Sequence, residues 1–234
     1  MRRSWQGWSS RRDSEHSGWV ELSRVLSSDM PKISYFPDAR VEQILQMPGD
    51  ALNLTEIQMV VHTGTHVDAP CHFIRDGPSI DEVPLDRFHG PGVVWRLDGL
   101  EPFEVIGVDR LRYAEPKIGQ DEIVLIDTGW AQDFGTGRYD DHPSLSAEAA
   151  HWLVDQKVKL VGLDVATPDL PTAQRPADFD WPVHQILLSN GVLIGEHLDG
   201  LADLAGARAE VLFLPLRIAG ADGGPARALA RRVE

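Results

Sequence analysis

Short runs of apolar residues, separated by turns rich in glycine and proline, recur along the chain from Val20 onward. Apolar runs of about four to eight residues bounded by such turns are typical of buried strands. Several of the runs have no polar face, which indicates strands that are covered on both sides. The pattern predicts strands at Glu56–Val61, Val93–Leu97, Ile123–Ile126, Leu160–Leu163, Val192–Ile194 and Val211–Leu214.

Two segments carry the signals of a helix. Ser146 is placed to cap a helix that runs to about Lys157, with apolar residues recurring at helical spacing. The second predicted helix has Asp180 as its N-cap, Pro182 in its first turn and Gly191 as its left-handed stop. Helices mixed with buried strands indicate a protein of the α/β class.

The first 19 residues differ from the rest of the chain because they are polar and rich in serine and arginine. We interpret residues 1–19 as an N-terminal extension that precedes one folded domain over residues 20–234. A chain of 234 residues is long enough for one substantial core. No repeat and no linker divides it further.

Composition and charge narrow the classes of partner. With 42% hydrophobic and 25% charged residues, the chain does not have the composition of a disordered protein. Its 22 basic and 36 acidic residues give a net charge of −14. A field of that sign repels phosphates and anionic membranes, so we expect neither a nucleic acid nor a membrane as partner. A small-molecule substrate is the expected partner.

Cysteine usage and the lack of long apolar segments bear on the compartment. Cys71 is the single cysteine, so an intramolecular disulfide is impossible and a reducing environment is tolerated. The N-terminus has no continuous apolar region of the kind found in signal peptides. No segment approaches the roughly 20 apolar residues of a membrane span. We therefore expect a cytoplasmic protein.

One short segment concentrates groups that bind metal ions. Residues 62–72 contain three histidines and an aspartate: His62, His66, Asp68 and His72. Imidazole nitrogen and carboxylate oxygen are ligands of zinc and manganese. His66 and Asp68 face the same side if the segment is extended. Gly64 permits a sharp turn before them and Pro70 stiffens the exit. The segment predicts a metal site with coordination positions left for water and substrate; the alternative is a surface loop with unrelated histidines.

A second pair of residues can reach the same place. His184 lies in the first turn of the second predicted helix, and Glu196 ends the strand that follows. The helix climbs roughly 9 Å from His184 to Asn190. An antiparallel strand returns by roughly 13–17 Å, so both side chains finish at comparable height and can meet at one ion. Each residue taken alone is equally compatible with a structural role.

The run His62-x-Gly-Thr-His66-x-Asp68-x-Pro-x-His72 resembles the signature of the cyclase-like metal-dependent hydrolases, which include bacterial kynurenine formamidase and isatin hydrolase. The resemblance extends from about residue 20 to 230, with weaker matches at 161–165, 184–196 and 221–227. It implies an α/β fold, a single compact domain with a mixed barrel-like β-sheet and flanking helices, of the swivelling β/β/α type. It also implies a homodimer or higher homo-oligomer.

The resemblance further implies a divalent metal cofactor, zinc first and manganese second. In the formamidase branch His62, His66 and Asp68 would hold the first ion. Asp68 and Glu196 would bridge the two ions, and His184 would hold the second. The isatin hydrolase branch implies a one-metal version of the site. The presence of both His184 and Glu196 favours two ions per chain.

His72 takes the role of catalytic acid/base by the same resemblance. A divalent ion lowers the pKa of bound water from 15.7 to about 7. The amine of a cleaved amide leaves only if it is protonated, and a positioned side chain that moves this proton contributes about 10²–10⁴-fold. Phe36 stands where the formamidases have a substrate-contacting tryptophan, and His197 where they have asparagine. We therefore regard Phe36 and His197 as candidate substrate-binding residues.

The expected function is hydrolysis of a non-peptide carbon–nitrogen bond, in an aryl formamide such as N-formylkynurenine or a cyclic amide such as isatin. Two alternatives remain open at this point: a cyclase or dehydratase of a biosynthetic pathway, and a metal-binding protein without catalysis. A Cys71–His72 nucleophilic pair is disfavoured, since neighbours in an extended chain point to opposite faces. The G-x-S-x-G motif of serine hydrolases is missing from the sequence.

Overall fold

The computed structural model describes residues 18–32 and 36–233. Most of the predicted N-terminal extension, residues 1–17, lies outside this part of the chain. The first described strand, β1 (Trp19–Glu21), begins inside the predicted extension and pairs with the last strand of the chain.

Seven strands close into a barrel, in the order β12-β11-β5-β7-β9-β10-β4, and β4 pairs back with β12. The neighbours among β5, β7, β9 and β10 are parallel, whereas every pairing that involves β4, β11 or β12 is antiparallel. The predicted single domain with a mixed, barrel-like sheet is therefore confirmed. The strands are β4 (His66–Asp68), β5 (His89–Arg96), β7 (Ile123–Asp127), β9 (Leu160–Leu163), β10 (Leu193–Glu196), β11 (Arg208–Pro215) and β12 (Gly223–Arg232).

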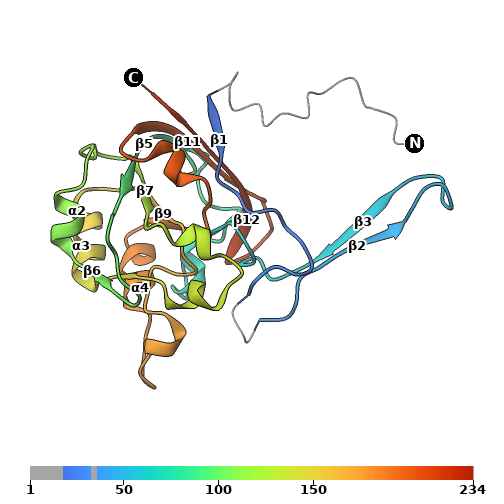
Figure 1. Ribbon diagram of the computed structural model, residues 1–234, viewed down its shortest axis with the longest axis horizontal. Coiled ribbons are helices and arrows are strands. Elements are labelled where there is room, and N and C mark those ends of the chain that lie inside the picture. Colours follow the sequence, from blue (N-terminus) through green and yellow to red (C-terminus); the bar gives the residue numbers. More distant parts are fainter. Residues whose placement is uncertain (1–17, 33–35, 234) are drawn as a thin grey trace.

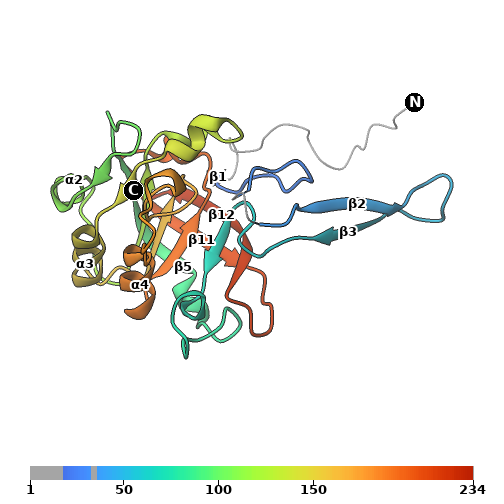
Figure 2. The same cartoon turned by 90° about the horizontal axis from the view of Figure 1, so that it is seen from below.

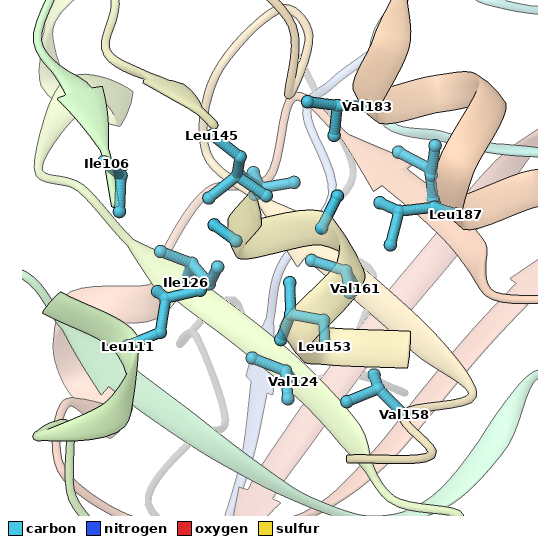
Figure 3. Close-up of a cluster of buried hydrophobic side chains, with 14 of the residues drawn as sticks. Ile106, Leu111, Val124, Ile126, Leu145, Leu153, Val158, Val161, Val183 and Leu187 are labelled. Carbon is cyan, nitrogen blue, oxygen red and sulfur yellow. The ribbon is translucent and has the colours of Figure 1, made fainter. Parts of the chain in front are cut away.

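Three helices cover the outside of the barrel on one side (Figure 1). They are α2 (Val108–Arg112), α3 (Ala147–Asp155) and α4 (Pro182–Ser189). Alternate residues of β7, such as Val124 and Ile126, point outward and form a core with Leu153 of α3 and Leu187 of α4 (Figure 3). This core fixes the height of α4 against the sheet.

The other face of each strand fills the barrel. Phe213 is fully buried there, and its ring lies against the backbone of Gly195 in β10. A Cβ atom added at Gly195 would lie 2.6 Å from Cε2 of Phe213, which is closer than real Cβ atoms come to a neighbour. Glycine at position 195 is therefore what allows a large ring inside a narrow barrel.

Five of the six predicted strands coincide with β5, β7, β9, β10 and β11 to within a few residues. The sixth, predicted at Glu56–Val61, is confirmed only for its first three residues. The strand there, β3 (Leu54–Gln58), is exposed throughout and ends at Gln58. The apolar residues that follow lead into a turn in which the N–H of Thr63 donates to the carbonyl of Val60 at 3.1 Å.

Strand β3 and its partner β2 (Arg40–Leu45) form a two-stranded hairpin that projects from the barrel (Figures 1 and 2). In the described part of the chain no third strand joins this pair. Several of its apolar residues expose 45% or more of their surface: Ile44, Met47, Leu52, Leu54 and Ile57.

The remaining elements are short. Strands β6 (Val105–Ile106) and β8 (Ser144–Leu145) form a small parallel pair beside α2 and α3. Single 3₁₀ turns occupy Pro70–His72, Leu85–Arg87, Trp130–Asp133, Gly137–Asp141, Thr172–Gln174 and Leu201–Leu204. Within the described ranges, none of the helices has the length and apolar character needed to cross a membrane.

Candidate metal centre

The strand that closes the barrel carries two of the predicted ligands. His66 and Asp68 lie at the two ends of β4, and Val67 between them points into the barrel core. The predicted common orientation of His66 and Asp68 is confirmed. In the antiparallel pairing of β4 with β10, Glu196 stands opposite His66. All three side chains project from the outer face of the barrel, where α4 covers them.

Helix α4 adds His184 to this group. Its Nε2 atom lies 3.4 Å from Oδ2 of Asp68 and 3.3 Å from Oε1 of Glu196. Across the group, Nε2 of His66 lies 3.3 Å from Oδ1 of Asp68 and 3.3 Å from Oε2 of Glu196. The four residues are buried, with at most 6% exposure. Two imidazoles and two carboxylates therefore alternate around one small buried space.

Contacts outside the group fix which nitrogen of each imidazole faces inward. Nδ1 of His66 lies 2.7 Å from the carbonyl oxygen of Gly64, which only accepts a hydrogen bond. Nδ1 of His184 lies 2.6 Å from Oδ2 of Asp169. Each Nδ1 therefore carries the proton and donates outward, which leaves the Nε2 lone pair directed into the group when the ring is neutral. Outer partners of this kind orient the histidine ligands of metals.

Asp169 also caps helix α4. Its two oxygens accept the backbone N–H groups of Val183 and His184, both at 3.0 Å. The predicted N-cap, Asp180, is wrong: Trp181 occupies the cap position, with a left-handed φ of 53°, and offers no side-chain cap. The cap comes instead from a distant loop, and the same carboxylate places the helix and orients His184.

Three atoms of the group have no hydrogen-bond partner among the described residues, although each is buried. They are Nε2 of His66, Oδ2 of Asp68 and Oε1 of Glu196. Buried polar atoms without partners are costly, and they are rare in folded proteins. A divalent cation among them would satisfy all three at once. The donor set of imidazole nitrogen and carboxylate oxygen fits zinc or manganese.

The pKa shifts within the group also favour a bound cation. Burial and the charge of Asp68 both raise the pKa of Glu196, yet contacts with His184 and His66 lower it to about 2. Burial alone would lower the pKa of His66, but Asp68 and Glu196 raise it to about 10. The two carboxylates are thus ionised at neutral pH and demand positive charge, which protons on the imidazoles or a bound dication can supply.

His62 lies beside the group rather than inside it. Its Nδ1 atom lies 2.8 Å from Oδ1 of Asp68, and its Nε2 atom lies 2.9 Å from Oδ2 of Asp222. Burial lowers its pKa, but the hydrogen bonds to Asp222 and Asp68 raise it overall. His62, His66 and Asp68 do offer ligand atoms within 4.8 Å of one another. The role of His62 as a ligand therefore stays a prediction.

His72 stands at the mouth of the group and is held by the same Asp222. Its Nδ1 atom lies 3.1 Å from Oδ2 of Asp222, and its ring stacks on that of His62 with 4.0 Å between centroids. A ring nitrogen of His72 also lies within 4.8 Å of ligand atoms of Asp68 and His184. With Nδ1 donating to the carboxylate, the free Nε2 atom can accept or return a proton.

A cavity of about 250 Å³ opens over these residues. His72, His184 and Glu196 lie on its wall, so both the predicted acid/base and part of the metal group reach it. The other lining residues are mainly aromatic or small: Phe36, Phe73, Trp181, Ala166 and Thr167, together with Arg175 and His62. Phe36, one of the two candidate substrate-binding residues, thus lines this cavity, and its contact with substrate stays a prediction.

The other candidate substrate-binding residue, His197, lies on the opposite side of the metal group. Its backbone has a left-handed φ of 57°, and its Nδ1 atom lies 2.9 Å from the hydroxyl of Tyr139. Burial and the neighbouring His66 lower its pKa to about 3, so the ring is neutral. It lines a second cavity of about 350 Å³ rather than the cavity beside His72.

Sequence reasoning missed the roles of Asp169 and Asp222. Asp222 lies just before β12, 160 residues from His62, and it reaches the group because β12 pairs with β4. The segment 221–227 was noted only as part of the family resemblance. No local pattern marks Asp169, because its role depends on where a loop meets the start of α4.

Comparisons with known proteins identify the family of the chain. Residues 20–170 match the family model described as "Putative cyclase". Kynurenine formamidase of Bacillus cytotoxicus is 30% identical over 225 residues, which cover 92% of this chain and 98% of the relative. Kynurenine formamidase of Salinibacter ruber is 34% identical over 188 residues, covering 77% and 81%. The predicted family resemblance is confirmed.

Solved structures show the same fold. Isatin hydrolase A from Labrenzia aggregata, bound to benzyl benzoate, superimposes with a TM-score of 0.82 at 27% identity, covering 92% of this chain and 94% of the other. A potential metal-dependent hydrolase with cyclase activity gives a TM-score of 0.75 at 26% identity, covering 92% and 98%.

Proposed function

The chain belongs to the cyclase family of hydrolases, and from that premise we propose that it is a metal-dependent hydrolase of non-peptide carbon–nitrogen bonds. The proposed substrates are an aryl formamide such as N-formylkynurenine, or a cyclic amide such as isatin. The observation that carries this proposal is the buried alternation of imidazoles and carboxylates, with its unpartnered atoms, at the wall of an aromatic cavity.

His66, Asp68, His184 and Glu196 would hold the metal, with His62 beside them. Zinc is the proposed metal and manganese the alternative; together with His62 the set offers five ligand residues, and two ions per chain are part of the proposal. When bound, a divalent ion supplies a Lewis acid for the amide carbonyl and lowers the pKa of water.

His72 would move the proton. Asp222 fixes its Nδ1 atom as a donor, so Nε2 is the atom that takes a proton and delivers it to the leaving nitrogen. A carboxylate that holds an imidazole in one tautomer has the same purpose in serine hydrolases. The His62 ring, stacked on His72 and bound to the same carboxylate, limits the rotation of His72.

The aromatic wall favours a planar substrate. Phe36, Phe73 and Trp181 line the cavity beside His72 and His184. Flat apolar rings are well suited to bury an aryl group while the amide faces the polar residues. This wall supports aryl amides over aliphatic amides as the substrate class.

The experiment that tests the proposal combines metal analysis with turnover. The purified chain, loaded with zinc or manganese, is assayed against N-formylkynurenine, simple formanilides and isatin, and metal per chain is measured. Activity that is lost to a chelator and restored by metal supports a hydrolase. Tightly held metal without turnover supports a non-catalytic metal protein, and product formed by ring closure or loss of water supports a cyclase or dehydratase.

Two variants separate the metal ligands from the proton carrier. His72→Ala should retain metal and lose about 10²–10⁴-fold in kcat, since proton transfer of this kind contributes that much. Asp68→Ala should lose both metal and activity, because Asp68 contacts both imidazoles of the group. A His72→Ala protein that lacks metal would contradict the assignment of His72 as proton carrier.

We further propose that the enzyme is a homo-oligomer, with the β2–β3 hairpin as the contact region. A two-stranded hairpin is marginally stable in isolation, and this one exposes apolar residues along its length. A second copy of the chain is the proposed occupant, since closed two-fold assemblies are the commonest. Sedimentation should give the mass of two or more chains, and Ile57→Glu should reduce it. Tyr113→Glu should not, because Tyr113 is exposed and directly follows α2, a helix on the other side of the barrel from the hairpin (Figure 1).

A further inference from the structure

We propose that Arg175 selects substrates that carry an anionic group, so that the amides cleaved are aryl amides with a carboxylate or a similar acid near the scissile bond. This inference rests on the proposed hydrolase function and adds to it a charge requirement on the substrate. It depends on three observations: the way Arg175 is held, the cavities that it lines and the lack of acceptors for its terminal nitrogens.

The guanidinium of Arg175 is held in place through its Nε atom and its contacts with aromatic rings, and its two terminal nitrogens remain available for a ligand. Its Nε atom donates to the carbonyl of Leu170 at 2.8 Å. Its central carbon lies 5.6 Å from the ring of Phe179 and 5.5 Å from the ring of Trp181. An arginine placed against aromatic rings loses little freedom when it binds a ligand, because its position is already restricted.

Arg175 lines both cavities beside the metal group. It forms part of the wall of the 250 Å³ cavity together with His72 and Glu196, and part of the wall of the 350 Å³ cavity together with His142 and His197. Ala166 and Thr167 also line both spaces. The positive charge of Arg175 therefore lies where the two cavities meet, on the wall of the same cavity in which the amide would be cleaved.

The terminal nitrogens of Arg175 have no acceptor in the described part of the chain, and no carboxylate lies within 4.0 Å of them. The other half-buried arginines differ. Terminal nitrogens of Arg24 bind Asp199 and two carbonyls, those of Arg87 bind two carbonyls, and those of Arg208 bind Glu122 and a carbonyl. In a chain with 36 acidic and 22 basic residues, an arginine in a cavity without an ion pair is unusual.

The chemistry of this group specifies the ligand. A guanidinium with both terminal nitrogens available matches the two oxygens of a carboxylate, which it binds in a bidentate manner. With the two divalent ions proposed for the neighbouring centre, the positive charge would exceed what Asp68 and Glu196 neutralise, so an anion would be attracted to the cavity despite the negative net charge. Phe36 and Trp181 would hold the aryl ring of the same molecule.

The test uses a pair of substrates that differ in one charge. Metal-loaded protein is assayed with 2-formamidobenzoate and with formanilide. The wild type should have the higher kcat/KM on the carboxylated compound. Arg175→Gln should lose about 10–100-fold in kcat/KM on that compound and change little on formanilide, the loss expected for one charged hydrogen-bonded contact. Arg175→Lys should retain only part of the preference for the carboxylated compound, because lysine keeps the positive charge but lacks the two parallel N–H donors of a guanidinium.

Arg217→Gln is the matched control, because Arg217 is exposed and lines neither cavity. Its kcat/KM values should equal those of the wild type. Equal effects of Arg175→Gln on both compounds, or no effect on either, would overturn the proposal. Unfolding temperatures of the variants establish that each remains folded.

A binding measurement separates this inference from the proposed function. Titration calorimetry compares benzoate and benzamide on metal-loaded wild type and on Arg175→Gln. If no amide is hydrolysed but benzoate binds about tenfold more weakly to Arg175→Gln, the hydrolase proposal fails and anion selection stands. If amides are hydrolysed and benzoate binds both proteins equally, the selection by Arg175 is refuted while the hydrolase proposal stands.

Discussion

Asp222 offers the sharpest test of how the centre works, because it touches the proposed proton carrier without belonging to the group of unpartnered ligand atoms. Its Oδ2 atom lies 3.1 Å from Nδ1 of His72 and 2.9 Å from Nε2 of His62. These two hydrogen bonds, which outweigh the effect of burial, hold the pKa of Asp222 well below its usual range. Asp222→Asn keeps the size of the side chain and removes its charge, so we expect kcat to fall while metal stays bound.

The expected loss of kcat can be worked out from the hydrogen bond between Asp222 and His72 and from the exposure of the Asp222 side chain. A hydrogen bond to a charged group contributes about 1.5–3 kcal/mol. The side chain of Asp222 is 48% exposed, so solvent screening favours the lower end of that range. About 1.5 kcal/mol corresponds to roughly a tenfold lower kcat. Asp222→Ala removes the acceptor altogether and should cost more, up to about 100-fold.

The assay is steady-state turnover on an aryl formamide together with metal analysis of the same protein samples. We expect a lower kcat, a nearly unchanged KM and a full complement of metal for both variants. An unchanged kcat would refute the idea that Asp222 positions His72. A loss of metal in Asp222→Asn would show instead that Asp222 acts through His62 on the ligand set.

Three further predictions address the barrel, the helix cap and a buried acid. Gly195→Ala should lower Tm, because its Cβ would press on Phe213 and overpacking costs about 1–3 kcal/mol; Gly137→Ala, whose Cβ meets nothing within 4 Å, should leave Tm unchanged. Asp169→Ala should weaken metal binding roughly 10–100-fold in a chelator competition, and unchanged affinity would show that the orienting contact is dispensable. Burial raises the pKa of Asp164 from 3.8 to about 6, so the native state binds this proton more tightly than the unfolded state does. The stability it contributes is present below about pH 4 and lost as pH rises through about 6, an amount of about 3 kcal/mol. In urea titrations the stability of the wild type relative to Asp164→Asn, which does not titrate, should therefore fall by about that amount between about pH 4 and about pH 7, and a constant difference would contradict this.

Local sequence signals predicted the parts of the fold that depend on local chemistry. The β-branched runs of β7 and β9 identify strands covered on both faces, and Ser146 caps α3 through a 3.1 Å bond from the amide of Ala149. Strand β12 was missed because its inward-facing residues, such as Ala228 and Ala230, are small and give a weak apolar pattern. Its assignment depends on pairing with β11 and β4, which a single strand does not reveal.

In the candidate site, too, the features with a local sequence signal were predicted and those that depend on tertiary contacts were not. The alternation of His66 and Asp68 and the helix-to-strand return from His184 to Glu196 are short-range patterns, and the structure brings these four side chains together. Asp222 acts on a residue 160 positions away, and Asp169 acts from an irregular loop 15 residues before His184. Their roles required the docking of a loop on α4 and the closure of the barrel, neither of which has a local signal.

Barrel closure also determines when during synthesis this centre can exist. Strand β4 joins the sheet through β10 and β12, and the contact between His62 and Asp222 spans 160 residues. Contacts of such long sequence separation form late in folding. A growing polypeptide on the ribosome therefore has no complete site until nearly all of the domain has emerged. Fragments that stop before Asp222 should be inert even where they retain all five predicted metal ligands.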